Sequence, residues 1–193
     1  MGESPGSRSP SLGPGALAQI LEREKWNKFG FVIFRTSYRD EKLWQQFLEE
    51  YESLLRAELN SANPELLSKV HMEMVSDDCM DNKIPAHIAL AYRLFDDIEP
   101  GLRTKMCLIV DQECMESVTV KHPNAVPFVK AVDVVLGTDV QSEYPRVIKV
   151  AISSLLARFY PALVNCDTVW EIASDGDTIW EDWPNITVPG ALG

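Results

Sequence analysis

The stretch FGFVIFRT, from Phe29 to Thr36, decides how the rest of the chain is interpreted. Its compact run of aromatic and β-branched residues suits a strand that is covered on at least one face, so we expect a central strand here. A helix is predicted directly after it, because Asp40 is a favourable N-cap and apolar residues from Trp44 to Leu55 recur at spacings of three and four. Together the two segments indicate a sheet with helices packed on it.

The remaining elements are predicted on either side of this strand and helix. Apolar and polar residues alternate within 66–75, and a period of two is typical of a half-buried strand. Apolar runs predict two further strands, and apolar residues at helical spacing predict helices that begin near Ala16 and Pro85. The expected elements are helices over 16–25 and 84–98, strands over 66–75, 106–110 and 126–136, and a turn or short helix over 111–117.

A last helix is predicted between Ser142 and Pro161. Ser142 is a favourable N-cap, and the residues from Val147 to Phe159 make a broad apolar face. The residue before a proline avoids helical backbone angles, so the helix should end there. We expect this helix to be largely buried.

The order of these elements predicts an α+β fold, a single domain over residues 16–164 with helices packed on a mixed sheet in a loosely ferredoxin-like arrangement. Residues 1–15 are rich in Gly, Ser and Pro, a composition that cannot offset the entropy of ordering, so a disordered tail is expected. Residues 165–193 are acidic and carry Trp170, Trp180 and Trp183 without a regular period. We expect this C-terminal segment to wrap over the domain.

Composition limits the class of protein and of partner. The chain has 193 residues, of which 46% are hydrophobic and 9% aromatic, enough to form the core of one domain. Its 29 acidic and 18 basic residues give a formal net charge of −11, which repels nucleic acid and anionic membrane surfaces. No apolar run approaches the ~20 residues of a membrane span. We therefore predict that neither nucleic acid nor a membrane is a partner.

The cysteines indicate a reducing compartment. They form no CxxC pair and do not have the His/Cys spacing of a zinc site, so we expect free thiols. Residues 1–15 contain no apolar segment of the kind that a secretory signal needs. Disulfides are therefore not expected, and the predicted location is the cytoplasm. The four cysteines are Cys79, Cys107, Cys114 and Cys166.

Several of these segments carry a resemblance to known sequences. The segment from Gly30 to Thr36 is followed by Trp44, and CLIVDQE at 107–113 is followed by Ser117 and Val118. In these segments the chain resembles a group of uncharacterised filamentous-fungal proteins, over roughly residues 26–136. Similar proteins tend to place an Asp-Gly turn ahead of the second helix, where this chain has Asp81-Asn82. The resemblance implies an origin but no activity.

Two of the residues with a candidate chemical role lie in the strand predicted at 66–75. His71-Met72-Glu73 matches the HxE half of a zinc deaminase signature, but no Pro-Cys-x-x-Cys follows, so two of the three metal ligands are missing. If the segment is a strand, His71 and Glu73 share one face and fit a simple cross-strand role. We predict no metal here.

The other two candidates are Asp111 and Asp133. Asp111 follows a buried strand, and the carboxyl ends of strands in open sheets commonly carry functional side chains, although Asp is also an ordinary turn residue. Asp133 lies with Lys130 in an otherwise apolar strand, where a charge needs a partner or a cavity. A position at the edge of the sheet would remove that need, and we favour this explanation.

Two classes of function remain open. Phosphate-binding loops and GxSxG elbows are absent from the sequence, so no cofactor is predicted. The first hypothesis is an intracellular binding or interaction protein whose unknown ligand is a small molecule or a protein, a homodimer included. The alternative is a cofactor-free enzyme, an isomerase, lyase or cyclase, whose apolar pocket holds one or two of the candidate residues. These candidates are His71, Glu73, Asp111 and Asp133.

Overall fold

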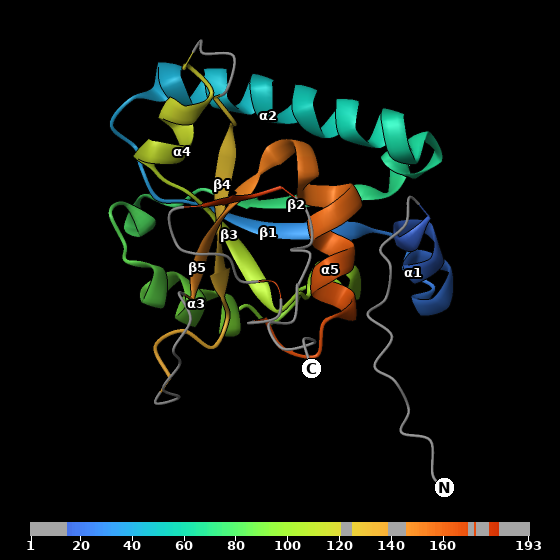
Figure 1. The fold of residues 1–193 in the computed structure, drawn as a ribbon. Coiled ribbons are helices and arrows are strands. Elements are labelled where there is room, and N and C mark those ends of the chain that lie inside the picture. Colours follow the sequence, from blue (N-terminus) through green and yellow to red (C-terminus); the bar gives the residue numbers. More distant parts are fainter. Residues whose placement is uncertain (1–14, 121–124, 139–145, 170–171, 173–177, 182–193) are drawn as a thin grey trace, which may run out of the picture.

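The fold is a six-stranded mixed sheet with helices on both faces (Figure 1). The computed structural model describes residues 15–120, 125–138, 146–169, 172 and 178–181. The strands lie in the order β2-β1-β3-β4-β5-β6, so the predicted α+β class is confirmed. Their bounds are β1 (Phe29–Arg35), β2 (Val70–Val75), β3 (Met106–Val110), β4 (Phe128–Asp133), β5 (Val147–Ala151) and β6 (Ile179–Trp180).

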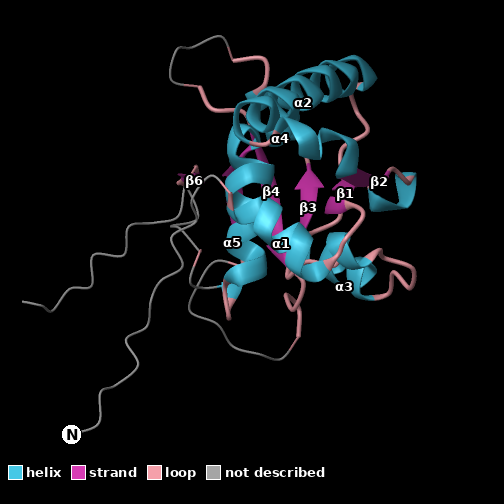
Figure 2. Ribbon diagram, turned by 90° about the vertical axis from the view of Figure 1, so that its right-hand side faces the viewer, coloured by secondary structure: helices cyan, strands magenta, loops and turns pink. Residues whose placement is uncertain are grey.

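Helices connect the strands and cover the two faces unequally (Figure 2). A large apolar core packs α1, α2, α4 and α5 on one face, and a smaller core packs α3 on the other. Among the described residues no helix is both long enough and apolar enough to cross a bilayer. The helices are α1 (Ala16–Glu24), α2 (Glu41–Ala62), α3 (Pro85–Arg93), α4 (Gln112–Ser117) and α5 (Tyr160–Asn165), with shorter turns at Pro64–Lys69, Asp78–Met80, Pro100–Leu102, Ile152–Ser154 and Leu155–Phe159.

The direction of the strands changes across the sheet. β1 runs parallel to both β2 and β3, whereas β3, β4 and β5 are antiparallel neighbours and β6 is parallel to β5. Because of the three parallel strands, the ferredoxin-like comparison fits only loosely. The chain leaves β1 toward β2 and leaves β3 toward β4, in opposite directions along the sheet. The strand order therefore reverses between β1 and β3, and crevices form at such points in open sheets.

The segment that decides the fold is the buried centre of the sheet. All seven residues of β1 are buried, as expected of a strand between two parallel neighbours. Its aromatic rings pack on the far end of the chain, with the Phe31 and Phe159 ring centroids 6.2 Å apart. Asp40 caps α2 as predicted, accepting a hydrogen bond of 2.9 Å from the amide of Leu43. The strand and the helix predicted from this segment are confirmed.

The helix predicted from Ser142 to Pro161 is wrong in its first half. Val147–Ala151 is strand β5, paired antiparallel with β4, and helical turns begin only at Ile152. Valine and isoleucine favour a strand wherever a neighbouring strand can pair with them. Pro161 lies in the first turn of α5, where a missing N–H group costs nothing, so it does not end the helix. Ser142 lies outside the described residues.

Two other expectations concern the ends of elements. α3 stops at Arg93, earlier than predicted, and Leu94 is exposed. In the C-terminal segment, Trp180 of β6 is 3% exposed and packs edge-on against Phe159, with ring centroids 5.0 Å apart. Trp170 and Trp183 lie outside the described residues, as does the predicted tail except for Gly15. The wrapping C-terminal segment therefore stays a prediction.

Candidate functional site

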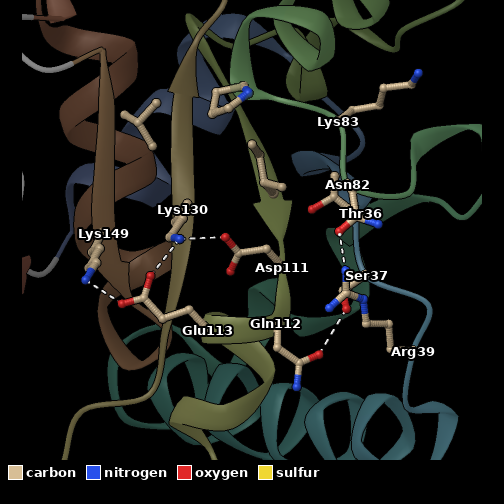
Figure 3. A pocket seen from close by; sticks show the side chains of 13 residues that line it. Thr36, Ser37, Arg39, Asn82, Lys83, Asp111, Gln112, Glu113, Lys130 and Lys149 are labelled. Carbon is tan, nitrogen blue, oxygen red and sulfur yellow. Dashed lines mark hydrogen bonds and ion pairs between the residues drawn. The ribbon is translucent and has the colours of Figure 1, made fainter.

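A polar cleft of about 720 Å³ opens where β1 and β3 end (Figure 3). Its lining comes from the loop between β1 and α2, from the loop that leads into α3, and from β3, β4 and β5 with the turn after β3. This is the point at which the strand order reverses, the usual place for a ligand crevice in an open sheet. Its polar and charged lining residues are Thr36, Ser37, Arg39, Asn82, Lys83, Asp111, Gln112, Glu113, Lys130 and Lys149.

The alternation of the strands aims the central side chains into the cleft. Lys130 in β4 and Lys149 in β5 are direct partners in the antiparallel ladder, so both project from the same face. This is the face on which Ile109 of β3 packs in the smaller core. Asp111 follows β3 and caps α4, accepting a 3.1 Å hydrogen bond from the amide of Cys114. The cap fixes where the Asp111 carboxylate lies.

The two opposed lysines are held together by carboxylates. Like charges directly across a ladder destabilise a sheet. Here Lys130 Nζ lies 2.5 Å from Asp111 Oδ2 and 2.7 Å from Glu113 Oε2, and Lys149 Nζ lies 2.6 Å from Glu113 Oε1. Figure 3 shows Lys130 between the two acids and Glu113 bridging both lysines. Glu113 thus compensates the repulsion that the register creates.

This cluster is a fixed arrangement of charges. Burial works to lower the pKa of Lys130, but hydrogen bonds to Asp111 and Glu113 outweigh it and raise that pKa above its ordinary value. The hydrogen bonds from Lys130 and Lys149 in turn lower the pKa of Glu113. Lys130 therefore stays an ammonium ion at neutral pH, which excludes it as an amine nucleophile.

Two further cations at the cleft have no carboxylate partner. Arg39 and Lys83 are exposed, and no acidic side chain of the described residues lies within ion-pair distance of either. Within the described part of the chain, Arg39 Nη2 makes only a long hydrogen bond, 3.4 Å, to Asn82 Oδ1. Four basic side chains against two acidic ones leave the cleft with two net positive charges, in a chain whose net charge is −11.

Of the four residues singled out in the sequence, only Asp111 lies in this cleft. His71 and Glu73 are on β2, at the edge of the described sheet, and His71 Nε2 lies 3.1 Å from Glu73 Oε2. They share one face, as the strand pattern predicts, beside a small hollow of about 160 Å³ that Ile98 also lines. Two further acids, Asp97 and Glu99, line this hollow, and Glu99 Oε1 lies 2.9 Å from Lys28 Nζ.

Asp133 is not at an edge, and that prediction is wrong. β4 lies between β3 and β5, and the Asp133 side chain is 4% exposed. The charge is stabilised by a partner: Arg146 Nη1 lies 3.0 Å from Asp133 Oδ2, and the amide of Val135 donates to Oδ1. Asp133 is opposite Met106 at the start of β3, whereas Asp111 follows its end. The two carboxylates therefore lie at opposite ends of the sheet.

A second cavity is apolar and lies between α2 and β2. It has a volume of about 460 Å³, and none of His71, Glu73, Asp111 or Asp133 lines it. The enzyme hypothesis requires an apolar pocket that holds at least one of these four residues. This apolar cavity does not meet that requirement.

Of the basic residues of the cleft, the sequence singled out only Lys130, as a charge in an apolar strand, and did not point to Arg39, Lys83 or Lys149. Arg39 and Lys83 are separated along the chain, and only the sheet brings their loops to one edge. A signal was available, because Arg39 lies just before α2 and Lys83 just before α3, and the sequence predicts a helix at both places.

Comparisons with protein-family models, with curated proteins and with solved structures find no match. The described residues hold no cluster of three or more His, Cys, Asp or Glu side chains suited to a metal ion.

Proposed function

We propose that this protein is a binding protein for a small anionic molecule, one that carries a phosphate or several carboxylate groups, and that the ligand occupies the polar cleft. One observation carries the proposal: Arg39 and Lys83, two exposed cations that have no carboxylate partner among the described residues, line a crevice at the point where the strand order reverses. A local excess of positive charge on an acidic protein draws anions to that place.

The lining residues divide the work of recognition. Arg39 and Lys83 bind the anionic groups of the ligand directly, because charged hydrogen bonds are stronger than neutral ones. Lys130 and Lys149 are neutralised by Asp111 and Glu113, so this cluster adds no net charge and forms a fixed wall behind the two exposed cations. The amide side chains of Asn82 and Gln112 provide hydrogen bonds for the uncharged part of the ligand.

Binding without chemistry fits the cleft better than the cofactor-free isomerase, lyase or cyclase. A general base needs an oxygen that is free to take a proton. Both oxygens of Asp111 already accept hydrogen bonds, Oδ1 from the amide of Cys114 and Oδ2 from Lys130. Lys130 itself stays protonated. The acid and the amine that an enzyme would use are thus committed to each other.

We also propose that the protein works in the reducing cytoplasm. Cys79, Cys107 and Cys114 are free thiols in the structure, and Cys107 and Cys114 are buried. Free thiols persist where glutathione and thioredoxin keep them reduced.

The test is a binding experiment with matched charge variants. Thermal shift with inorganic phosphate, pyrophosphate, nucleoside diphosphates and di- and tricarboxylates selects the ligand, and titration calorimetry measures its affinity. Arg39→Ala and Lys83→Ala should each weaken binding by roughly tenfold or more, the usual effect of losing a hydrogen bond to a charged group. The control is Arg23→Ala, which removes an exposed charge on α1, before β1 begins. The proposal is contradicted if Arg39→Ala and Lys83→Ala bind the ligand as tightly as the wild type does. It is also contradicted if Arg23→Ala weakens binding as much as they do.

A further inference from the structure

Strand β2 is an open edge of the described sheet. It pairs with β1 on one side only, and β6 forms the opposite edge (Figure 2). None of the six residues of β2 is fully buried, whereas every residue of β1 and β3 is. Edge strands are usually short, covered or interrupted by proline, because unpaired backbone groups invite another strand. β2 contains no proline and is longer than the two-residue β6, so it is the edge at which a further strand can pair.

The backbone groups on the outer side of β2 have no partner within the described part of the chain. The carbonyl oxygen of His71 faces β1, since a Cβ built on Gly30 would lie 2.0 Å from it. Successive residues of a strand direct their N–H and C=O groups to alternate sides, so those of Met72 and Met74 face away from β1. No described residue forms a hydrogen bond with these outer groups. A strand that pairs here would satisfy them, as in other cases of β-strand addition.

One face beside this edge is apolar. On the side of the sheet where α2 packs, Val70, Met72 and Met74 line the cavity of about 460 Å³. Glu52 and Arg56 also line it, but Arg56 Nη2 lies 4.0 Å from Glu52 Oε2, so their charges compensate each other. Every second side chain of an added strand projects toward this face. An apolar side chain fits there, because the unbranched methionines adapt to its shape.

The hollow on the opposite face of β2 is acidic. His71 and Glu73 project toward it, and Asp97 and Glu99 also line it. Glu99 is paired with Lys28, but Asp97 is exposed and has no ion-pair partner among the described residues. The remaining side chains of an added strand project toward this hollow. A lysine or arginine there meets the carboxylates of Glu73 and Asp97, so charge complementarity favours a basic side chain.

We propose that β2 binds an extended segment of another protein in which basic residues alternate with apolar ones. The segment adds a strand to the sheet through backbone hydrogen bonds, with its apolar side chains toward α2 and its basic side chains toward the acidic hollow. A second copy of this chain fits less well. An antiparallel pair of β2 strands would bring two acidic hollows side by side, in molecules that each carry a net charge of −11. The site is separate from the anion cleft, which no residue of β2 lines.

The test uses short synthetic peptides whose binding is followed by fluorescence anisotropy. A peptide that alternates lysine with valine should bind saturably. A peptide that alternates glutamate with valine is repelled by the hollow, and one that holds the lysines and valines in two separate blocks cannot match both faces. Each should bind at least about tenfold more weakly. Equal binding of the block peptide would overturn the proposal, since simple attraction to an acidic protein would then explain the binding.

Methylated peptides test the backbone contact without altering the protein. In an alternating strand, the backbone groups that face β2 belong to one residue type only, either lysine or valine. N-methylation of that type removes the donors and should weaken binding by about tenfold or more, whereas N-methylation of the other type should leave the affinity nearly unchanged. If both methylated peptides bind as tightly as the unmodified one, or both lose affinity equally, no strand pairs with β2 and the proposal fails.

Charge variants locate the peptide on the protein. Asp97→Lys should weaken binding of the lysine–valine peptide roughly threefold to tenfold, because it replaces an attractive charge in the hollow by a repulsive one. Glu22→Lys makes the same change of charge at an exposed position of α1 and should have little effect. Equal effects of the two variants contradict the proposal. A dimer of the peptide-free protein that the peptide dissociates contradicts it too, because a second copy would then occupy the edge.

Discussion

Glu113 is the residue on which the lysine pair of the cleft depends. Without its charge, Lys130 and Lys149 face each other across the ladder with only Asp111 to compensate them. Glu113→Gln should lower the free energy of unfolding by about 1 kcal/mol, as for other exposed pairs in sheets. Urea denaturation measures the change, and Glu49→Gln on the exposed side of α2 serves as the control.

The same substitution should strengthen anion binding severalfold, since it removes one of the two carboxylates that lower the positive potential of the cleft. A variant that is less stable but binds its ligand more tightly would show that the positive charge of the cleft favours binding and destabilises the fold. If Glu113→Gln binds the anion no better than the wild type, the carboxylate is not part of the binding field.

Glu58 makes stability depend on pH. Burial raises the pKa of Glu58 from its ordinary 4.5 to about 7, against the opposite effect of the Leu156 and Ala157 amides. Because the folded state resists ionisation, the contribution of the neutral form is fully present below about pH 4.5 and is lost as the pH rises through 7. Relative to Glu58→Gln, the wild type should lose roughly 3 kcal/mol across this range, as urea unfolding at several pH values would show. A difference that does not change with pH would show that Glu58 is solvated.

At the scale of elements, the contact between β1 and β2 depends on Gly30. Its φ is +148°, and a Cβ built on it would lie 2.0 Å from the carbonyl oxygen of His71. Gly30→Ala should therefore cost more than about 3 kcal/mol or prevent folding, since both the backbone and the neighbouring strand oppose the methyl group. Gly15→Ala, whose Cβ would meet only Gln19 at 3.8 Å, should cost less than about 1 kcal/mol. Thermal unfolding compares the two, and a mild Gly30→Ala would show that the strands can separate there.

The elements that the sequence predicted correctly are those whose signals are local. β1 has a run of aromatic and β-branched residues, and α2 has both a cap and a helical period. The residues from Val147 to Phe159 carry no such decisive signal, because a short apolar run fits a strand or a buried helix equally well. Pairing with β4 decides in favour of the strand. This is a tertiary contact that no local pattern contains.

At the scale of the whole molecule, the sequence gives the average charge and the fold gives its distribution. The net charge of −11 predicts repulsion of anions, yet two loops and three strands gather an excess of cations in one crevice. Asp111 was predictable as a residue that follows a buried strand. Its pairing with Lys130 was not, because it depends on the register of β3 and β4.

The most direct test of the central claim is a map of where an anion binds. Pyrophosphate is titrated into ¹⁵N-labelled protein while the amide signals are followed. We predict that the largest shifts fall on Ser37, Asn82 and Gln112, around the cleft, and that they vanish in the Arg39→Ala/Lys83→Ala double variant. Shifts scattered over other basic side chains, or no saturable shift in a protein that stays folded, would contradict the account.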